Sequence, residues 1–186
     1  MTTYHQNISD PYIHEPKGIT TATAGSVYVA NGAGSGSWID AHSYINGYID
    51  FDATTPAYQH SVTTGYTPLN PTFSVSVVKN FSGVSSPNAR LVYTGATSVI
   101  TTATFSFNFK NGDSVDRNLE MVFYKNGAPM NGGHIIMTAV AGEWRSASLT
   151  DMVELNTNDY VEIFVKGSDA FTLDVASASL IMTGAE

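Results

Sequence analysis

Asp50 and Asp52 are two carboxylates spaced so that they could act together in metal binding or catalysis. They flank Phe51, and residues i and i+2 of an extended strand point to the same face. Two neighbouring carboxylates can hold a calcium ion or act as the acid and base pair that polysaccharide hydrolysis requires. The other interpretation is a solvated strand face, since charge on exposed strands prevents edge-to-edge association. We adopt the second interpretation and predict no catalytic residue.

The remaining chemistry-bearing residues lack the spacing of a metal or catalytic site. The Gly-rich segment 31–37 is not followed by the Gly-Lys-Ser/Thr of a phosphate loop, and no Gly-x-Ser-x-Gly elbow is present. With no cysteine, thiolate ligands and nucleophiles are excluded. The histidines are scattered, with none within four residues of another: His5, His14, His42, His60 and His134. The sequence therefore predicts a protein that is not an enzyme and has no metal and no cofactor.

Charge limits the partners of the chain. Its 186 residues contain 16 Asp and Glu against 8 Lys and Arg, a formal net charge of -8, and no basic residue lies between Lys17 and Lys79. Such a chain cannot neutralise a run of phosphates, which argues against nucleic acid and against an anionic membrane surface. We also expect no membrane span and no classical secretion signal. The absence of cysteine suits a protein made in a reducing cytoplasm that later functions outside a cell, as virus structural proteins do.

Residues 1–42 differ in composition from the rest of the chain. They show no convincing period and are rich in Gly, Ala, Ser, Thr and Asn, so we expect an extended arm. Its aromatic residues exceed what an inert linker needs, and Tyr12, Tyr28 and Trp38 are predicted to anchor the arm to a partner. The alternative is that residues 27–29 and Trp38 pack on the body as an edge strand.

Residues 43–186 carry the signature of short β-strands. Phe105, Phe107 and Phe109 alternate with polar residues, which indicates a strand with one buried face. Strands spaced by roughly 10 residues, without amphipathic helices between them, are typical of an all-β antiparallel sandwich or barrel. The predicted strands are 48–51, 58–62, 72–78, 90–93, 101–109, 119–124, 134–140, 146–149, 160–165 and 171–182.

The strand 160–165 has large side chains on both faces. One face carries Val161, Ile163 and Val165, as a sandwich core requires. The opposite face carries Tyr160, Glu162 and Phe164. Because the outer face of a sandwich sheet is usually polar, we predict that these three residues contact another subunit. The alternative is that a neighbouring loop of the same chain covers the two rings.

Four segments together resemble one known family: Arg90–Gly95, Tyr124–Gly127, Asn158–Glu162 and Val175–Met182. Their succession is similar to the jelly roll of tumour necrosis factor and the complement globular head, and in particular to versions found in bacteriophage head and tail proteins. The resemblance covers about residues 73–186. Segments 14–18 and 28–38 are also similar to amino-terminal segments of phage virion proteins.

The resemblance implies a two-sheet sandwich of ten strands that assembles as a homotrimer, with one sheet of each subunit facing the axis. The family's Gly-Asp-Tyr-Val pattern corresponds to residues 158–161 here, with Asn158 in place of the glycine. It implies that strand 160–165 lines the trimer interface. Residues 43–72 do not align strand for strand, so the strand order there is left open.

These observations lead to a non-enzymatic phage virion protein on the outer capsid surface. It would be a homotrimeric capsid decoration or short head-fibre protein, with residues 1–42 attached to the major capsid protein or another virion protein. The alternative is a tail-tip or spike module whose loops recognise a host surface glycan, on which Trp38 or Trp144 could stack. A third possibility, a polysaccharide-cleaving enzyme, would rest on Asp50 and Asp52.

Overall fold

The computed structural model describes residues 26–30, 36–40, 44–53, 57–84 and 89–185. The chain divides into two compact units, residues 1–43 and 44–186. In the first unit, β1 (Ser26–Ala30) pairs with β2 (Gly36–Asp40) in an antiparallel sheet of their own. Residues 26–30 and 36–40 therefore pair with each other in a separate sheet, and the arm of residues 1–42 stays a prediction.

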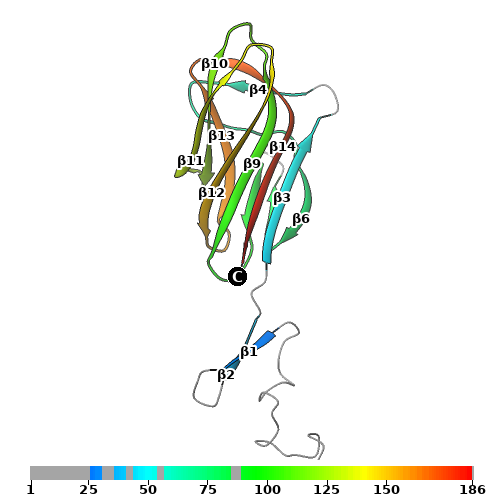
Figure 1. Cartoon of the computed structure of the whole chain (residues 1–186), viewed down its shortest axis with the longest axis vertical. Helices are drawn as coiled ribbons and strands as arrows, with labels where there is room; N and C mark the ends of the chain where they lie inside the picture. Colours follow the sequence, from blue (N-terminus) through cyan, green and yellow to red (C-terminus); the bar gives the residue numbers. More distant parts are fainter. Residues whose placement is uncertain (1–25, 31–35, 41–43, 54–56, 85–88, 186) are drawn as a thin grey trace, which may run out of the picture. The chain divides into compact units, whose positions relative to one another are not determined.

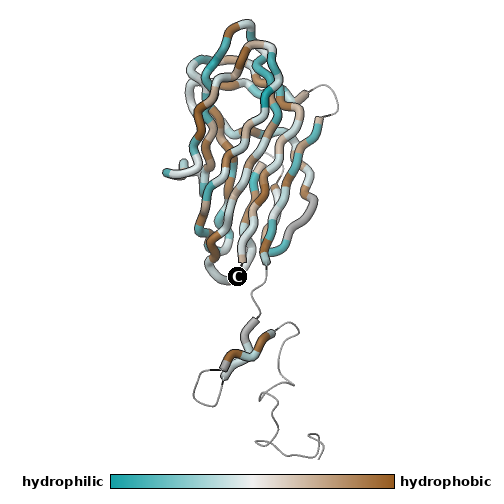
Figure 2. The backbone as a smooth tube through the Cα atoms, viewed as in Figure 1, coloured by the Kyte–Doolittle hydropathy of each residue, from teal (hydrophilic) through white to brown (hydrophobic). Residues whose placement is uncertain are grey.

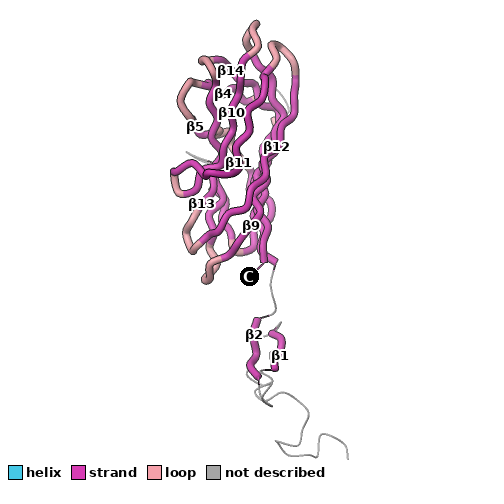
Figure 3. The backbone as a smooth tube through the Cα atoms, turned by 60° about the vertical axis from the view of Figure 1, so that its left-hand side comes forward, coloured by secondary structure: helices cyan, strands magenta, loops and turns pink. Residues whose placement is uncertain are grey.

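The second unit is a sandwich of two six-stranded sheets (Figures 1 and 3). One sheet, here called the β9 sheet, has the order β12-β9-β14-β3-β6, with β4 paired to β14; the other, the β10 sheet, has the order β11-β10-β13-β8-β7, with β5 paired to β13. The strands are β3 (Tyr44–Asp52), β4 (Tyr58–Val62), β5 (Thr67–Pro68), β6 (Ser74–Lys79), β7 (Phe81–Val84), β8 (Arg90–Tyr93), β9 (Val99–Asn111), β10 (Arg117–Lys125), β11 (Ala128–Ala139), β12 (Trp144–Leu155), β13 (Tyr160–Gly167) and β14 (Phe171–Ala185).

The predicted all-β antiparallel sandwich is confirmed. Each predicted strand has its counterpart, although most are longer than expected. The strands β5 and β7, of two and four residues, were not predicted. The strand order that the sequence left open is now defined: β3 pairs with β14 and β6, and β4 pairs with the first half of β14.

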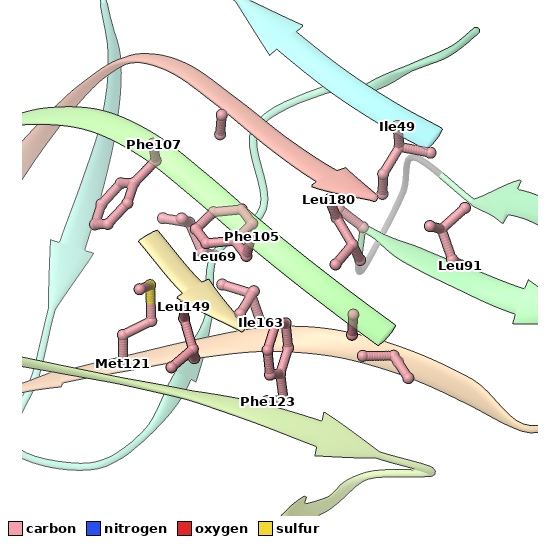
Figure 4. Packing of buried hydrophobic residues seen from close by; sticks show 14 of the residues in the cluster. Ile49, Leu69, Leu91, Phe105, Phe107, Met121, Phe123, Leu149, Ile163 and Leu180 are labelled. Atoms are coloured by element: carbon pink, nitrogen blue, oxygen red, sulfur yellow. The ribbon is translucent and has the colours of Figure 1, made fainter. Parts of the chain in front are cut away.

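Apolar and polar residues alternate along the strands (Figure 2), so the two faces of each sheet differ in polarity. In β9, odd-numbered residues from Val99 to Asn111 are buried and even-numbered ones are not, as period-2 geometry requires. The buried side chains of both sheets meet in one core, where Phe105 and Leu180 of the β9 sheet face Met121, Phe123 and Ile163 of the β10 sheet (Figure 4). This burial is the dominant stabilising contribution.

Tight turns occur where the sequence has Asn-Gly or Asn-Asp. Asn126 and Gly127 have φ angles of 53° and 78°, the left-handed geometry of a two-residue hairpin turn. Asn158 has a φ of 72°, a conformation that asparagine tolerates better than most residues. Asparagine and glycine are thus placed where the backbone needs a positive φ.

Candidate assembly interface

The outer face of β13 was the predicted subunit interface. Val161, Ile163 and Val165 are buried in the core, as predicted. On the opposite face, Tyr160 and Phe164 are half-buried within the single chain, and Glu162 is only 2% exposed. The three side chains are therefore less accessible in one subunit than the side chains of an open interface would be.

Neighbouring side chains of the same chain cover the two rings of β13. The ring of Phe164 stacks on that of Tyr124 of β10, with centroids 3.8 Å apart, and Tyr66 meets Tyr124 edge-on at 5.9 Å. The guanidinium of Arg90 lies 4.5 Å from the ring centroid of Tyr160. Both rings are therefore contacted within the chain, but by residues of the adjacent strands β10 and β8 and not by the loop that the alternative named. A subunit contact at Tyr160, Glu162 and Phe164 stays a prediction.

Glu120 is the centre of a charged cluster on the same face of the β10 sheet. Its Oε1 lies 2.7 Å from Nε2 of His134 and accepts a hydrogen bond from the hydroxyl of Tyr66, while its Oε2 lies 3.0 Å from Nζ of Lys166. The Lys166 ammonium also lies 4.4 Å from the centroid of the Tyr66 ring. Burial alone raises the pKa of Glu120, but hydrogen bonds from Tyr66 and Lys166 and the charges of His134 and Lys166 outweigh it, so the pKa lies below its ordinary value. Tyr66, in the turn before β5, is thereby fixed over the sheet.

The outer face of the β9 sheet presents exposed apolar side chains instead. We call the group Tyr44, Ile100, Met152 and Ile181 the β9-sheet patch. Each is exposed and lies at an outward position of its strand, next to a buried residue on at least one side. The patch draws one residue from each of four adjacent strands, β3, β9, β12 and β14. Clustered exposed apolar residues of this kind mark interaction surfaces.

The strand register places the patch at one end of the β9 sheet. Ile181 pairs with Tyr48 and Thr104, and Met152 pairs with Thr102, which in turn pairs with Thr183. Tyr44 and Ile100 lie on the next outward positions. Met152 and Ile100 are therefore diagonal neighbours on adjacent strands, within reach of each other, and Thr102 and Thr183 lie between this pair and Ile181.

The rest of this face is polar but mostly uncharged. Its side chains bond across strands: Ser106 to Ser179 at 2.9 Å, Thr104 to Thr150 at 3.2 Å, and Asn108 to Ser177 at 2.7 Å. Because these groups are already paired, covering them removes fewer hydrogen bonds to water than covering free hydroxyls would. Such a face can be buried at low desolvation cost.

Asp50 and Asp52 lie on this same face, as their spacing predicts. They line a shallow hollow of about 540 Å³ over the small serine side chains of β9, β12 and β14. In the described part of the chain, no group of three or more His, Asp or Glu residues is arranged to hold a metal ion. The described residues form no helix that is long and apolar enough to cross a membrane.

Two of the predicted arm anchors contact each other. Tyr28 and Trp38 are directly paired across the β1–β2 hairpin, with ring centroids 5.4 Å apart in an edge-on arrangement. Tyr12 lies outside the described residues. Sequence reasoning missed the β9-sheet patch, although Ile100 and Ile181 carry a readable signal: each is a large apolar residue at the polar position of an alternating strand.

Comparisons with known proteins identify the fold. No family model matches the chain, and no curated protein matches it either. Among solved structures, the Eiger TNF of S. frugiperda aligns over 76% of this chain and 92% of its own, with a TM-score of 0.51 and 7% identity. The PRD1 vertex protein P5 aligns over 75% of this chain and 95% of its own (TM-score 0.45, 10% identity), and murine APRIL over 75% and 98% (TM-score 0.40, 7% identity). The two sheets thus form a jelly roll like that of tumour necrosis factor, as the sequence resemblance implied.

Proposed function

We propose that this protein is a non-enzymatic virion structural protein: a homotrimeric capsid decoration or short head-fibre protein of a bacteriophage, displayed on the outer capsid surface. The observation that carries the proposal is the β9-sheet patch, an exposed apolar group on one face of a jelly roll. The sequence resemblance of residues 14–18, 28–38 and 73–186 to phage virion proteins supports the location on a particle.

The trimer is proposed to form through the outer face of the β9 sheet. Ile100 is 60% exposed in the single chain and Tyr44 is 83% exposed, so a second subunit could bury apolar surface there. Burying apolar surface contributes roughly 25 cal/mol per Å², and the paired hydroxyls beside the patch add little desolvation cost. Since each subunit carries a net charge of -8, a mostly uncharged face is also the one that identical copies can bring together.

The outer face of the β10 sheet is the weaker candidate. Its rings already stack on one another, and its charged residues Glu120, Lys166 and His134 are paired within the chain. The prediction that Tyr160, Glu162 and Phe164 form the interface is therefore kept as the competing assignment.

The amino-terminal unit is proposed to attach the trimer to the major capsid protein or another virion protein. Three arms on one trimer would bind three neighbouring coat subunits, and the second and third contacts would then form intramolecularly. Weak individual contacts become strong in this way. Neither nucleic acid nor a membrane is expected as a partner.

Two matched substitutions test the trimer and its face. Ile100 on the β9 sheet and Ile136 on the β10 sheet are 60% and 61% exposed, so Ile100→Glu and Ile136→Glu make the same change at equal exposure. Analytical ultracentrifugation should give the wild type and Ile136→Glu three times the chain mass of 19.9 kDa, and Ile100→Glu a lower mass with an unchanged circular dichroism spectrum. A monomeric wild type would overturn the trimer, and the reverse pattern would move the interface to the β10 sheet.

Attachment is tested by sedimenting purified protein with particles that lack it. The full chain should sediment with the particles, and a chain without residues 1–42 should stay in the supernatant while remaining a folded trimer. Binding of the purified trimer to host cells, with no binding to particles, would instead favour the glycan-recognising tail-tip or spike module.

A further inference from the structure

The β1–β2 hairpin carries large apolar side chains on both faces. Tyr28 and Trp38 form one face, and Val27 and Val29, each 45% exposed, belong to the other. No charged residue lies between Ser26 and Ile39, and only Asp40 ends the second strand with a charge. Whichever face of this hairpin meets solvent, apolar side chains are exposed to water.

The hairpin is nevertheless a specifically built element. Its register runs without a shift from Ser26 opposite Asp40 to Ala30 opposite Gly36. A Cβ at Gly36 would lie 2.8 Å from the Tyr28 ring and 2.3 Å from the carbonyl oxygen of Val29. The aromatic ring therefore packs directly over the glycine backbone, a device that fixes strand register.

Within the described part of the chain, the sheet of β1 and β2 has no third strand. Natural edge strands are protected by charges, prolines or bulges, and the described residues of β1 and β2 have none of these except Asp40 at the end. A single two-stranded hairpin is marginally stable in water. The element that covers it must supply strands as well as apolar side chains.

We propose that the occupants are the same hairpins of the other two subunits. In the trimer, β1 of one copy pairs with β2 of the next, and three hairpins close into a six-stranded ring with Val27 and Val29 on its inside. This inference rests on the proposed trimer. The Tyr28 and Trp38 face then points outward and remains available to a coat protein.

Three features favour copies of this chain over a foreign strand. A head-to-tail contact repeated by threefold rotation closes on itself and leaves no free edge. The valine face carries no charge that would repel its copies, although each chain has a net charge of -8. Only residues 41–43 separate Asp40 from Tyr44 of the β9-sheet patch, so a trimer assembled through that patch holds its hairpins at a high effective concentration.

Amide hydrogen exchange of the full-length protein, without particles, tests the ring. A solitary hairpin protects alternate amides of residues 26–30 and 36–40, because each strand bonds to its partner through every second residue. The ring protects the intervening amides as well, so the number of slowly exchanging amides in this segment should be about doubled. Sedimentation of the same sample reports the trimer independently.

Paired variants complete the test. Val27→Asp with Val29→Asp should reduce protection to that of a solitary hairpin or less, while the mass stays trimeric and amides of β9 and β14 stay protected. Ser26→Asp, on the aromatic face by register, should keep the ring protected. If the protein is a trimer but its hairpin amides exchange like those of a solitary hairpin, the ring is wrong and the trimer stands. If protection arises only after particles are added, the occupant is a strand of the coat protein and the ring is also wrong. A monomeric wild type overturns the proposed trimer as well.

Discussion

The carboxylate of Asp159 lies 2.9 Å from the ammonium of Lys125 and ties together two turns at one end of the β10 sheet. Its Oδ1 accepts a 2.6 Å hydrogen bond from the side-chain amide of Asn126, and its Oδ2 accepts a 2.9 Å bond from the backbone N–H of Asn156. The N–H of Tyr160 returns a 2.9 Å bond to Oδ1 of Asn126. The turn after β10 and the turn before β13 are thus fixed by one acidic side chain.

Replacing Asp159 by alanine should therefore destabilise the fold. Loss of a carboxylate that accepts several hydrogen bonds leaves their donors unpaired, and we expect a decrease of about 1–3 kcal/mol in the free energy of unfolding. Urea denaturation at pH 7 measures it. The control is Asp169→Ala, which removes an exposed ion pair with Arg117 and should change the stability by less than about 1 kcal/mol.

The same carboxylate makes the stability of the fold depend on pH, and its pKa sets the direction of that dependence. Burial alone raises the pKa of Asp159, but the bonds from Asn156, Lys125 and Asn126 lower it from 3.8 to about 2. A lowered folded-state pKa stabilises the protein above pH 4, and that stabilisation is lost as the pH falls from about 4 to about 2. The difference in stability between wild type and Asp159→Ala should shrink over this window, and a constant difference would contradict the assignment.

The sequence predicts features that neighbouring residues encode, and it does not predict contacts between residues far apart in the chain. The Asn126-Gly127 turn is encoded by two adjacent residues, and the predicted buried face of Phe105, Phe107 and Phe109, which is encoded by alternating residues of one segment, is confirmed. The contact of Tyr66 with Glu120 joins residues 54 apart in the sequence, and nothing local announces it. For that reason the aromatic residues of β13 suggested a subunit contact, whereas the fold supplies Tyr124, Tyr66 and Arg90 as neighbours.

The Tyr66 hydroxyl should matter most at neutral pH. Tyr66→Phe removes a hydrogen bond to Glu120 and should lower the free energy of unfolding by about 1 kcal/mol. Because the folded-state pKa of Glu120 is lowered, the cluster stabilises the protein above the ordinary carboxyl pKa and loses that effect as the pH falls through the folded-state value. The acid unfolding midpoint of Tyr66→Phe should therefore lie at higher pH than that of the wild type. Tyr124→Phe, which keeps the ring stacked on Phe164, is the control and should leave the midpoint nearly unchanged.

Phe164→Ala separates packing within the chain from packing between chains. The substitution removes a ring that stacks on Tyr124 at 3.8 Å, and we expect a loss of about 1–3 kcal/mol in the free energy of unfolding. If the trimer forms through the β9 sheet, the sedimentation mass of the folded protein should not change. A folded monomer would show instead that Phe164 belongs to the interface, as the sequence first suggested.

Gly47 is required for the close approach of β3 to residues of the β10 sheet. A Cβ at this position would lie 2.8 Å from Cγ of Phe81 and 3.1 Å from Cδ2 of Leu91, and both side chains are buried. Alanine gains about 0.5–1 kcal/mol over glycine in a strand interior, but overpacking a well-filled core costs about 1–3 kcal/mol. The ring of Phe81 cannot easily move aside, because it packs against Tyr93 with centroids 5.4 Å apart.

Overpacking should therefore prevail, and Gly47→Ala should lower the thermal unfolding midpoint. The comparison is Gly142→Ala, where no atom lies within 4 Å of the new Cβ but φ is +68°, so that only backbone strain of about 1–2 kcal/mol is expected. A Gly47→Ala protein as stable as the wild type would mean that β3 and Phe81 can separate without loss of packing. Because β3 carries Tyr44 of the β9-sheet patch, Gly47→Ala should also weaken the trimer, measured as a higher dissociation constant in sedimentation equilibrium.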